Sequence, residues 1–178
     1  MKNYKKILKS LKNKIIDGEI RVKFSAGIQK RVFAKILGYI NQQGLGEQLD
    51  KGISIVFDPD VYKYLDKFNQ SLHDTDVLWT KPSELSFYCG LGIPIIIAPP
   101  LGTHEKSNRR WLTELHTGIK APGPPEYVHE WLFDLRETGR LAEMAWDGFL
   151  TTRKMGTFLI EDVVTTGSFT PSQNPMEQ

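Results

Sequence analysis

The stretch at residues 76–108 constrains the fold most, because strand, helix and strand patterns follow one another within it. Two apolar runs, at 77–80 and 94–98, predict strands. Three consecutive isoleucines in the second run are typical of a strand that is buried on both faces. The residues between the runs predict a short helix over 83–91, ended by Gly92. Together they predict a βαβ unit, in which ligands bind at the carboxyl ends of the parallel strands.

The rest of the chain continues this alternation of strand and helix patterns. Further strands are predicted at 20–24, 53–57 and 118–119, and helices at 1–16, 28–42, 61–72, 126–138, 140–152 and 158–164. Strands that alternate with helices of this length predict an α/β fold with a doubly wound, mainly parallel sheet and helices on both faces. The expected domains are a basic amphipathic helix at 1–18, an α/β domain at 19–164 and a disordered polar tail at 165–178.

Composition sets the general class of the protein. With 178 residues, 40% hydrophobic and 25% charged, the chain is large enough to bury a core and is typical of a soluble globular protein. Its single cysteine, Cys89, excludes an internal disulfide and is predicted to be a buried hydrophobic side chain rather than a nucleophile. No apolar run is long enough to span a bilayer and no signal-peptide core is visible, which predicts a cytoplasmic protein.

Positive charge is concentrated near the N-terminus. Residues 1–37 hold eleven lysines and arginines against two acidic residues, Asp17 and Glu19. Within 4–16, apolar residues recur at helical spacing opposite a lysine-rich side. This helix either lies on an anionic membrane surface or packs on a protein domain with its lysines in solvent. Nucleic acid is disfavoured, because aromatic residues do not interleave with the basic ones.

The segment at 76–108 resembles the C-terminal donor-binding domain of GT-B glycosyltransferases. That group includes the peptidoglycan N-acetylglucosaminyltransferase and the diacylglycerol glycosyltransferases. The residues that carry the resemblance are Thr80-Lys81-Pro82, Gly92-Ile93-Pro94 and the loop at 102–108. The likeness extends more faintly over 20–165. The chain departs from the family pattern where Ser83-Glu84 replaces a Gly-Gly pair and Phe87 stands at the ribose-binding carboxylate position.

The resemblance implies a Rossmann-like GT-B half that binds a UDP-sugar for an inverting, metal-independent glycosyltransferase. Such a domain works with an acceptor-binding domain or subunit and needs no cofactor. A peripheral position at an anionic membrane surface fits this class. Two alternatives remain open: a non-catalytic interaction domain of the same fold, or half of a sugar-nucleotide epimerase.

The resemblance also implies a set of donor-binding residues. They are Ser25, Ala26, Gly27, Gln29, Lys81, Pro82, Ser83, Glu84, Gly102, His104, Glu105 and Asn108. Small residues at 25–27 allow backbone N–H groups to approach a diphosphate, although a tight turn alone explains them equally well.

The roles of the remaining candidates follow from their positions on predicted helices. Ser83 and Glu84 open the short helix, either as ordinary capping residues or facing the diphosphate and the ribose. Glu105 and Asn108, three residues apart at a helix start, present a carboxylate and an amide suited to sugar hydroxyls. The four histidines lie in different segments without metal-ligand spacing, so no metal site is predicted, and no general base is identified.

Overall fold

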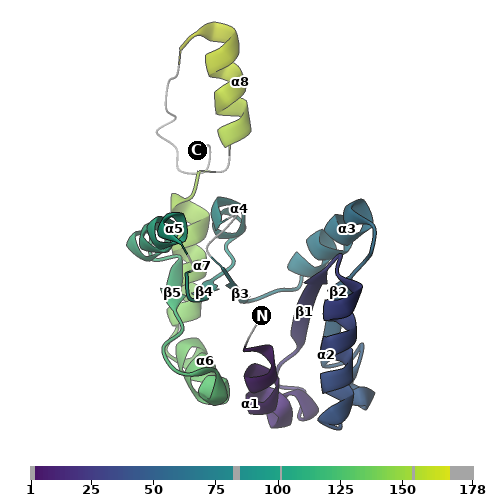
Figure 1. The fold of residues 1–178 in the computed structure, drawn as a ribbon. Coiled ribbons are helices and arrows are strands. Elements are labelled where there is room, and N and C mark those ends of the chain that lie inside the picture. The colour runs from purple at the N-terminus through teal and green to yellow at the C-terminus, as the bar shows by residue number, and fades with distance from the viewer. Residues whose placement is uncertain (1–2, 82–84, 101, 154, 169–178) are drawn as a thin grey trace. The chain divides into compact units, whose positions relative to one another are not determined.

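The computed structural model describes residues 3–81, 85–100, 102–153 and 155–168. The chain divides into two compact units. Unit 1 comprises Met1–Thr75 and Gly123–Phe133, and unit 2 comprises Asp76–Pro122 and Asp134–Gln178. Figure 1 shows the helices and strands of both units.

Unit 1 is built around two parallel strands joined by a crossover helix. Its elements are α1 (Tyr4–Ile16), β1 (Val22–Gly27), α2 (Lys30–Gln42), the short 3-10 helix η1 (Gly46–Gln48), β2 (Ile53–Phe57), α3 (Val61–Leu72) and the 3-10 helix η2 (Pro125–Tyr127). Strands β1 and β2 pair in parallel, with Val22 opposite Ile53 and Phe24 opposite Ile55.

Helices α1 and α2 cover the same face of this sheet. The Tyr4 ring of α1 meets the rings of Phe24 in β1 and Tyr39 in α2 edge-on, with centroid distances of 6.2 Å and 5.8 Å. Phe33 of α2 stacks on Phe57 of β2 at 4.8 Å. The apolar stripe of α1 is buried at its leucines and at Ile15. The apolar stripe predicted at the N-terminus therefore packs on protein.

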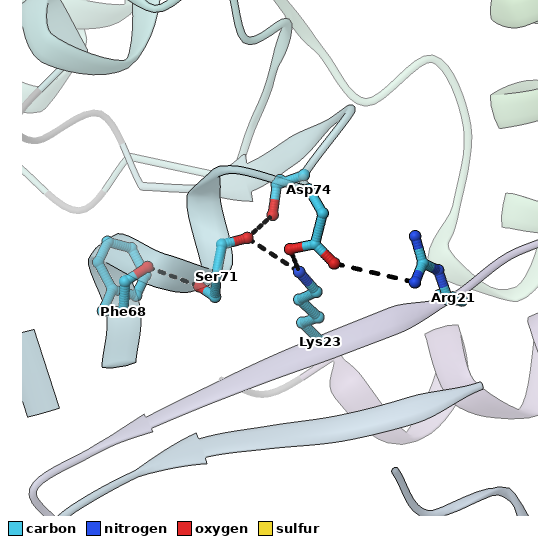
Figure 2. A network of polar contacts seen from close by, with 6 residues as sticks. Arg21, Lys23, Phe68, Ser71 and Asp74 are labelled. Carbon is cyan, nitrogen blue, oxygen red and sulfur yellow. Dashed lines mark hydrogen bonds and ion pairs between the residues drawn. The ribbon is translucent and has the colours of Figure 1, made fainter. Parts of the chain in front are cut away.

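Helix α3 covers the opposite face, which is polar along β1. Lys23, whose side chain points away from the Phe24 face, donates to the Ser71 carbonyl at 2.9 Å and forms an ion pair with Asp74. Arg21 lies 3.9 Å from the other Asp74 oxygen, and Ser71 donates to the Phe68 carbonyl (Figure 2). These contacts fasten the end of α3 to β1 by charge and hydrogen bonds.

Unit 2 contains a three-stranded parallel sheet of order β3-β4-β5. Its elements are β3 (Leu78–Thr80), α4 (Leu85–Gly90), β4 (Ile95–Ile97), α5 (Thr103–Glu114), β5 (Gly118–Lys120), α7 (Arg140–Thr151) and α8 (Gly156–Thr166). Helix α6 (Val128–Glu137) begins in unit 1 and ends in unit 2. All three isoleucines of β4 are buried, so this strand is covered on both faces, as its apolar sequence predicts.

Helices α4 and α7 pack closely in unit 2. A Cβ atom on Gly148 would lie 2.8 Å from the Cys89 carbonyl oxygen, so only glycine permits this approach. The Cys89 side chain is fully buried, as predicted, and its Sγ donates to Thr117 Oγ1 at 3.3 Å. Burial raises the pKa of the Cys89 thiol above its ordinary value, which keeps the thiol protonated.

The α/β class and the parallel pairing of strands are confirmed, whereas the strands lie in two small sheets where the sequence predicted one. Hydrophobic periodicity identifies strands but does not specify their partners, and this explains the difference. Strand β1 begins at Val22 and includes residues 25–27, which were predicted as a turn. Helix α8 runs to Thr166, two residues into the predicted tail, and 169–178 lie outside the described residues.

Candidate functional site

The candidate site lies where β3 and β4 of unit 2 end side by side. The Ala98 amide donates to the Thr80 carbonyl at 2.8 Å, which extends the parallel pairing beyond both strands. Lys81 directly follows the first strand, and the loop into α5 follows the second. Because both chain segments leave the sheet at its carboxyl edge, side chains from the two loops meet there.

Lys81 and Glu105 come from these two chain segments and form an ion pair. Lys81 Nζ lies 4.0 Å from Glu105 Oε1, and the two side chains are 46% and 16% exposed. Glu105 stands in the first turn of α5, where the helix dipole stabilises a carboxylate. A half-exposed cation beside a largely shielded carboxylate gives the edge both an anion-binding group and an acceptor for hydroxyl groups.

His104 and Asn108 flank this pair on α5. A Cβ atom on Gly102 would lie 3.2 Å from His104 Cε1 and 3.4 Å from its Nδ1, so the imidazole covers the backbone at the helix start. Asn108 is exposed one helical turn beyond Glu105. The predicted residues Lys81, Gly102, His104, Glu105 and Asn108 therefore belong to one edge of unit 2.

The predicted residues at the start of the short helix are only partly described. Pro82, Ser83 and Glu84 lie outside the described residues. Phe87, at the position where the resemblance to GT-B domains implies a ribose-binding carboxylate, lies within α4 and is 53% exposed.

The remaining four predicted residues belong to unit 1. Ser25, Ala26 and Gly27 form the end of β1, and Gln29 precedes α2 with extended backbone. Gly27 has a φ of 62°, a left-handed conformation that glycine adopts without strain, and its carbonyl accepts from the Asp58 amide at 3.4 Å. The small-residue loop thus exists, but it ends a strand of the other sheet.

Tyr64 is a neighbour of this loop that the sequence did not indicate. Its hydroxyl lies 2.8 Å from Ser25 Oγ, with Tyr64 on α3 and Ser25 on β1. The available signal was its place one turn into the helix that follows β2, the strand paired with β1. The described residues hold no group of three or more His, Cys, Asp or Glu side chains arranged to bind a metal ion.

Comparison with protein-family models assigns the chain to a family. A model described as a domain of unknown function, DUF6938, matches residues 1–159. The chain belongs to the DUF6938 family. All twelve predicted donor-binding residues fall within the matched DUF6938 region, whereas α8 runs past its end.

Two further comparisons, with curated proteins and with solved structures, found no match. Within the described ranges, none of the helices is both long and apolar enough to cross a membrane.

Proposed function

We propose that this chain is the donor-binding domain of an inverting, metal-independent glycosyltransferase and that it binds a UDP-sugar. The observation that carries the proposal is the Lys81–Glu105 pair at the carboxyl edge of two parallel strands. This edge is where α/β sheets bind their ligands. The resemblance of 76–108 to GT-B donor domains supports the same assignment, and a doubly wound, Rossmann-like half is the finer fold proposed with it.

Three residues of the edge, Lys81, Glu105 and Asn108, have proposed roles. Lys81 offers its ammonium group to the diphosphate, and the first turn of α5 adds N–H donors and a favourable dipole. Glu105 and Asn108 accept and donate hydrogen bonds at the sugar hydroxyls. In the transfer step the bond between the anomeric carbon and the UDP oxygen breaks as the acceptor oxygen attacks from the opposite side. Lys81 would stabilise the negative charge on the departing UDP.

The acceptor and the base that deprotonates it are assigned to a separate domain or subunit. The roles of Ser25, Ala26, Gly27 and Gln29, which belong to unit 1, stay predictions from the resemblance alone. The proposed compartment is the cytoplasm, which fits a single buried cysteine.

Calorimetric titration of the intact chain with UDP and with UDP-sugars tests this proposal. Glu105→Gln should weaken UDP-sugar binding about tenfold, because a charged acceptor of sugar hydroxyls is lost, without weakening binding of UDP itself. Lys81→Met should weaken the binding of both UDP and UDP-sugars, since both ligands carry the diphosphate. Glu114→Gln, at the other end of α5 and paired with Arg110, is the matched control and should change neither affinity.

A wild-type chain that binds neither UDP nor any UDP-sugar at millimolar concentration would overturn the proposal. Equal losses of UDP-sugar affinity in Glu105→Gln and Glu114→Gln would show that the edge does not have the assigned role.

A non-catalytic interaction domain is the second candidate, and exposed apolar side chains favour it. Phe87 occupies the ribose position and is exposed, and α8 exposes Phe158, Ile160, Val163 and Val164. Such surfaces mark sites of protein association more often than sites for a charged nucleotide. On this alternative Glu105→Ala and Asn108→Ala change no binding property, and the chain associates with a protein partner through the apolar residues.

A further inference from the structure

Helices α1 and α2 carry many basic residues and no acidic ones. The cations are Lys5, Lys6, Lys9, Lys12 and Lys14 in α1, and Lys30, Arg31 and Lys35 in α2. Both helices lie on one face of the unit 1 sheet, joined through the Tyr4–Tyr39 ring contact and a hydrogen bond from the Tyr39 hydroxyl to the Lys5 carbonyl. Their positive charges therefore add on the same side of unit 1.

Three of these cations have partners within unit 1. Lys6 pairs with Glu126 and Lys14 with Glu19, each at 2.7 Å, and Lys12 donates to the Gln43 carbonyl. For the other five, the structure records no ion pair within the described ranges. We call these five exposed side chains the basic face: Lys5, Lys9, Lys30, Arg31 and Lys35.

The charge of the whole chain is divided unevenly between its units. Unit 1 holds 14 lysines and arginines against 10 acidic residues, whereas unit 2 holds 9 against 11. The net charge of +2 is therefore the sum of a positive charge on unit 1 and a negative charge on unit 2. An anionic surface would attract unit 1 and would orient this unit with the basic face toward the surface.

We propose that the basic face docks on the surface of an anionic lipid bilayer. Charge complementarity carries this assignment, because lysines and arginines close to anionic headgroups each add to the attraction. The contact is made without inserting α1, since Leu8, Leu11 and Ile15 are buried in the fold. The proposal stands independently of the donor site, because it concerns residues of unit 1 that have no proposed role there.

The aromatic residues of these helices favour a bilayer over nucleic acid as the partner. Tyr4 packs against Phe24 and Tyr39, and Lys5 Nζ lies 5.0 Å from the centre of the Tyr39 ring. These rings contact protein groups, whereas single-stranded nucleic acid requires aromatic faces open for base stacking.

Flotation of the full chain with phosphatidylcholine vesicles, with and without phosphatidylserine, tests the proposal. We expect recovery with phosphatidylserine only, and loss of binding as salt shortens the Debye length from about 10 Å to about 3 Å. Lys9→Glu, Arg31→Glu and Lys35→Glu together should lower the partition coefficient on the order of 100-fold.

Lys51→Glu, Lys63→Glu and Lys120→Glu together form the matched control. This triple variant makes the same change in net charge at exposed residues outside α1 and α2, and it should retain most of the binding. Circular dichroism of both triple variants checks that each remains folded.

Three results would each overturn the proposal. Equal recovery with and without phosphatidylserine would remove the role of charge, and binding that resists high salt would indicate insertion of the apolar stripe instead. Tight binding to an RNA oligonucleotide, together with no recovery on anionic vesicles, would assign the basic face to nucleic acid.

Discussion

Strand β4 is the middle strand of the unit 2 sheet and β1 is one of the two strands of the unit 1 sheet, and the two are buried differently. All three residues of β4 are buried isoleucines, so apolar contacts cover both faces of the strand. In β1, Phe24 and Ala26 are buried on the face that carries α1 and α2. On the other face Lys23 and Ser25 form hydrogen bonds to α3, and Lys23 forms an ion pair with Asp74 in the turn after α3.

This difference separates two sources of stability. Apolar burial in unit 2 contributes a free energy that depends little on pH or salt near neutrality. The polar face of β1 adds interactions that salt screens and that protonation of a carboxylate removes. Substitutions in the two units should therefore differ both in magnitude and in their response to solution conditions.

The largest expected effect comes from emptying the core of unit 2. Ile96→Ala removes a buried side chain from β4 and leaves a cavity, which should lower the free energy of unfolding by about 2–5 kcal/mol. Ile160→Ala in α8, where the side chain is 67% exposed, should change it by less than about 0.5 kcal/mol. Urea unfolding measures both, and equal effects would show that β4 is not the core strand described.

Two helical glycines, one in each unit, make a matched pair. In Gly148→Ala the new methyl group would lie 2.8 Å from the Cys89 carbonyl oxygen, so α7 must shift from α4 at a cost of about 1–3 kcal/mol. Gly38→Ala in α2 meets no atom within 4 Å, and higher helix propensity should stabilise unit 1 by about 0.5–1 kcal/mol. Thermal unfolding should give shifts of opposite sign, and two shifts of the same sign would contradict the packing of α4 on α7.

A smaller effect is expected at the start of α3. Asp60 is its N-cap, and its carboxylate accepts from the Tyr62 and Lys63 amides at 2.9 Å and 3.0 Å. Asp60→Ala leaves both donors without this acceptor and should cost about 1 kcal/mol in urea unfolding. Asp66→Ala, in the middle of the same helix, is the control, and a loss as large as that of Asp60→Ala would argue against capping.

The smallest effect should come from the ionic contact of Figure 2, and it should depend on pH. The hydrogen bond and charge of Lys23, with a further contribution from Arg21, hold the pKa of Asp74 below its ordinary value of 3.8. A carboxyl group with a depressed pKa stabilises the folded state above its unfolded pKa. That contribution is lost as the pH falls through the lower folded value.

Asp74→Asn should therefore be less stable than the wild type at neutral pH and low salt, and the difference should vanish in acid or at high salt. Asp66→Asn, an aspartate of α3 with no ion pair recorded in the described part of the chain, is the control. Urea unfolding at several pH values follows both variants. A loss at Asp74 that persists unchanged below the folded pKa would rule out the ionic explanation.

The elements of the fold were largely predictable from local patterns. The apolar run at Ile53–Phe57 is bounded by Gly52 and the Asp58-Pro59 turn, and strand β2 has those limits. The packing partner of each apolar face was not predictable, because an apolar stripe such as that of α1 suits a protein core and a membrane equally well. Pairing of strands into two sheets depends on contacts between distant residues, which periodicity does not encode.

The candidate site was predictable where one βαβ unit contains it. Lys81 and Glu105 are far apart in sequence, but each follows a strand, and parallel strands bring their carboxyl ends together. The contact between Tyr64 and Ser25 was missed because it joins β1 to a helix that follows the next strand, 39 residues away in sequence. Position along a strand was thus informative at a sheet edge, whereas side-chain partners across a face were not.

Amide chemical shifts of the isotope-labelled chain, followed during titration with a UDP-sugar, test the proposed donor site most directly. We expect saturable chemical-shift changes at Lys81 and across 102–108, at the carboxyl edge of the unit 2 sheet. The chemical shifts of the α7 amides, at Arg140–Thr151, should not change. The absence of saturable shifts at Lys81 and 102–108 at millimolar ligand would contradict the account.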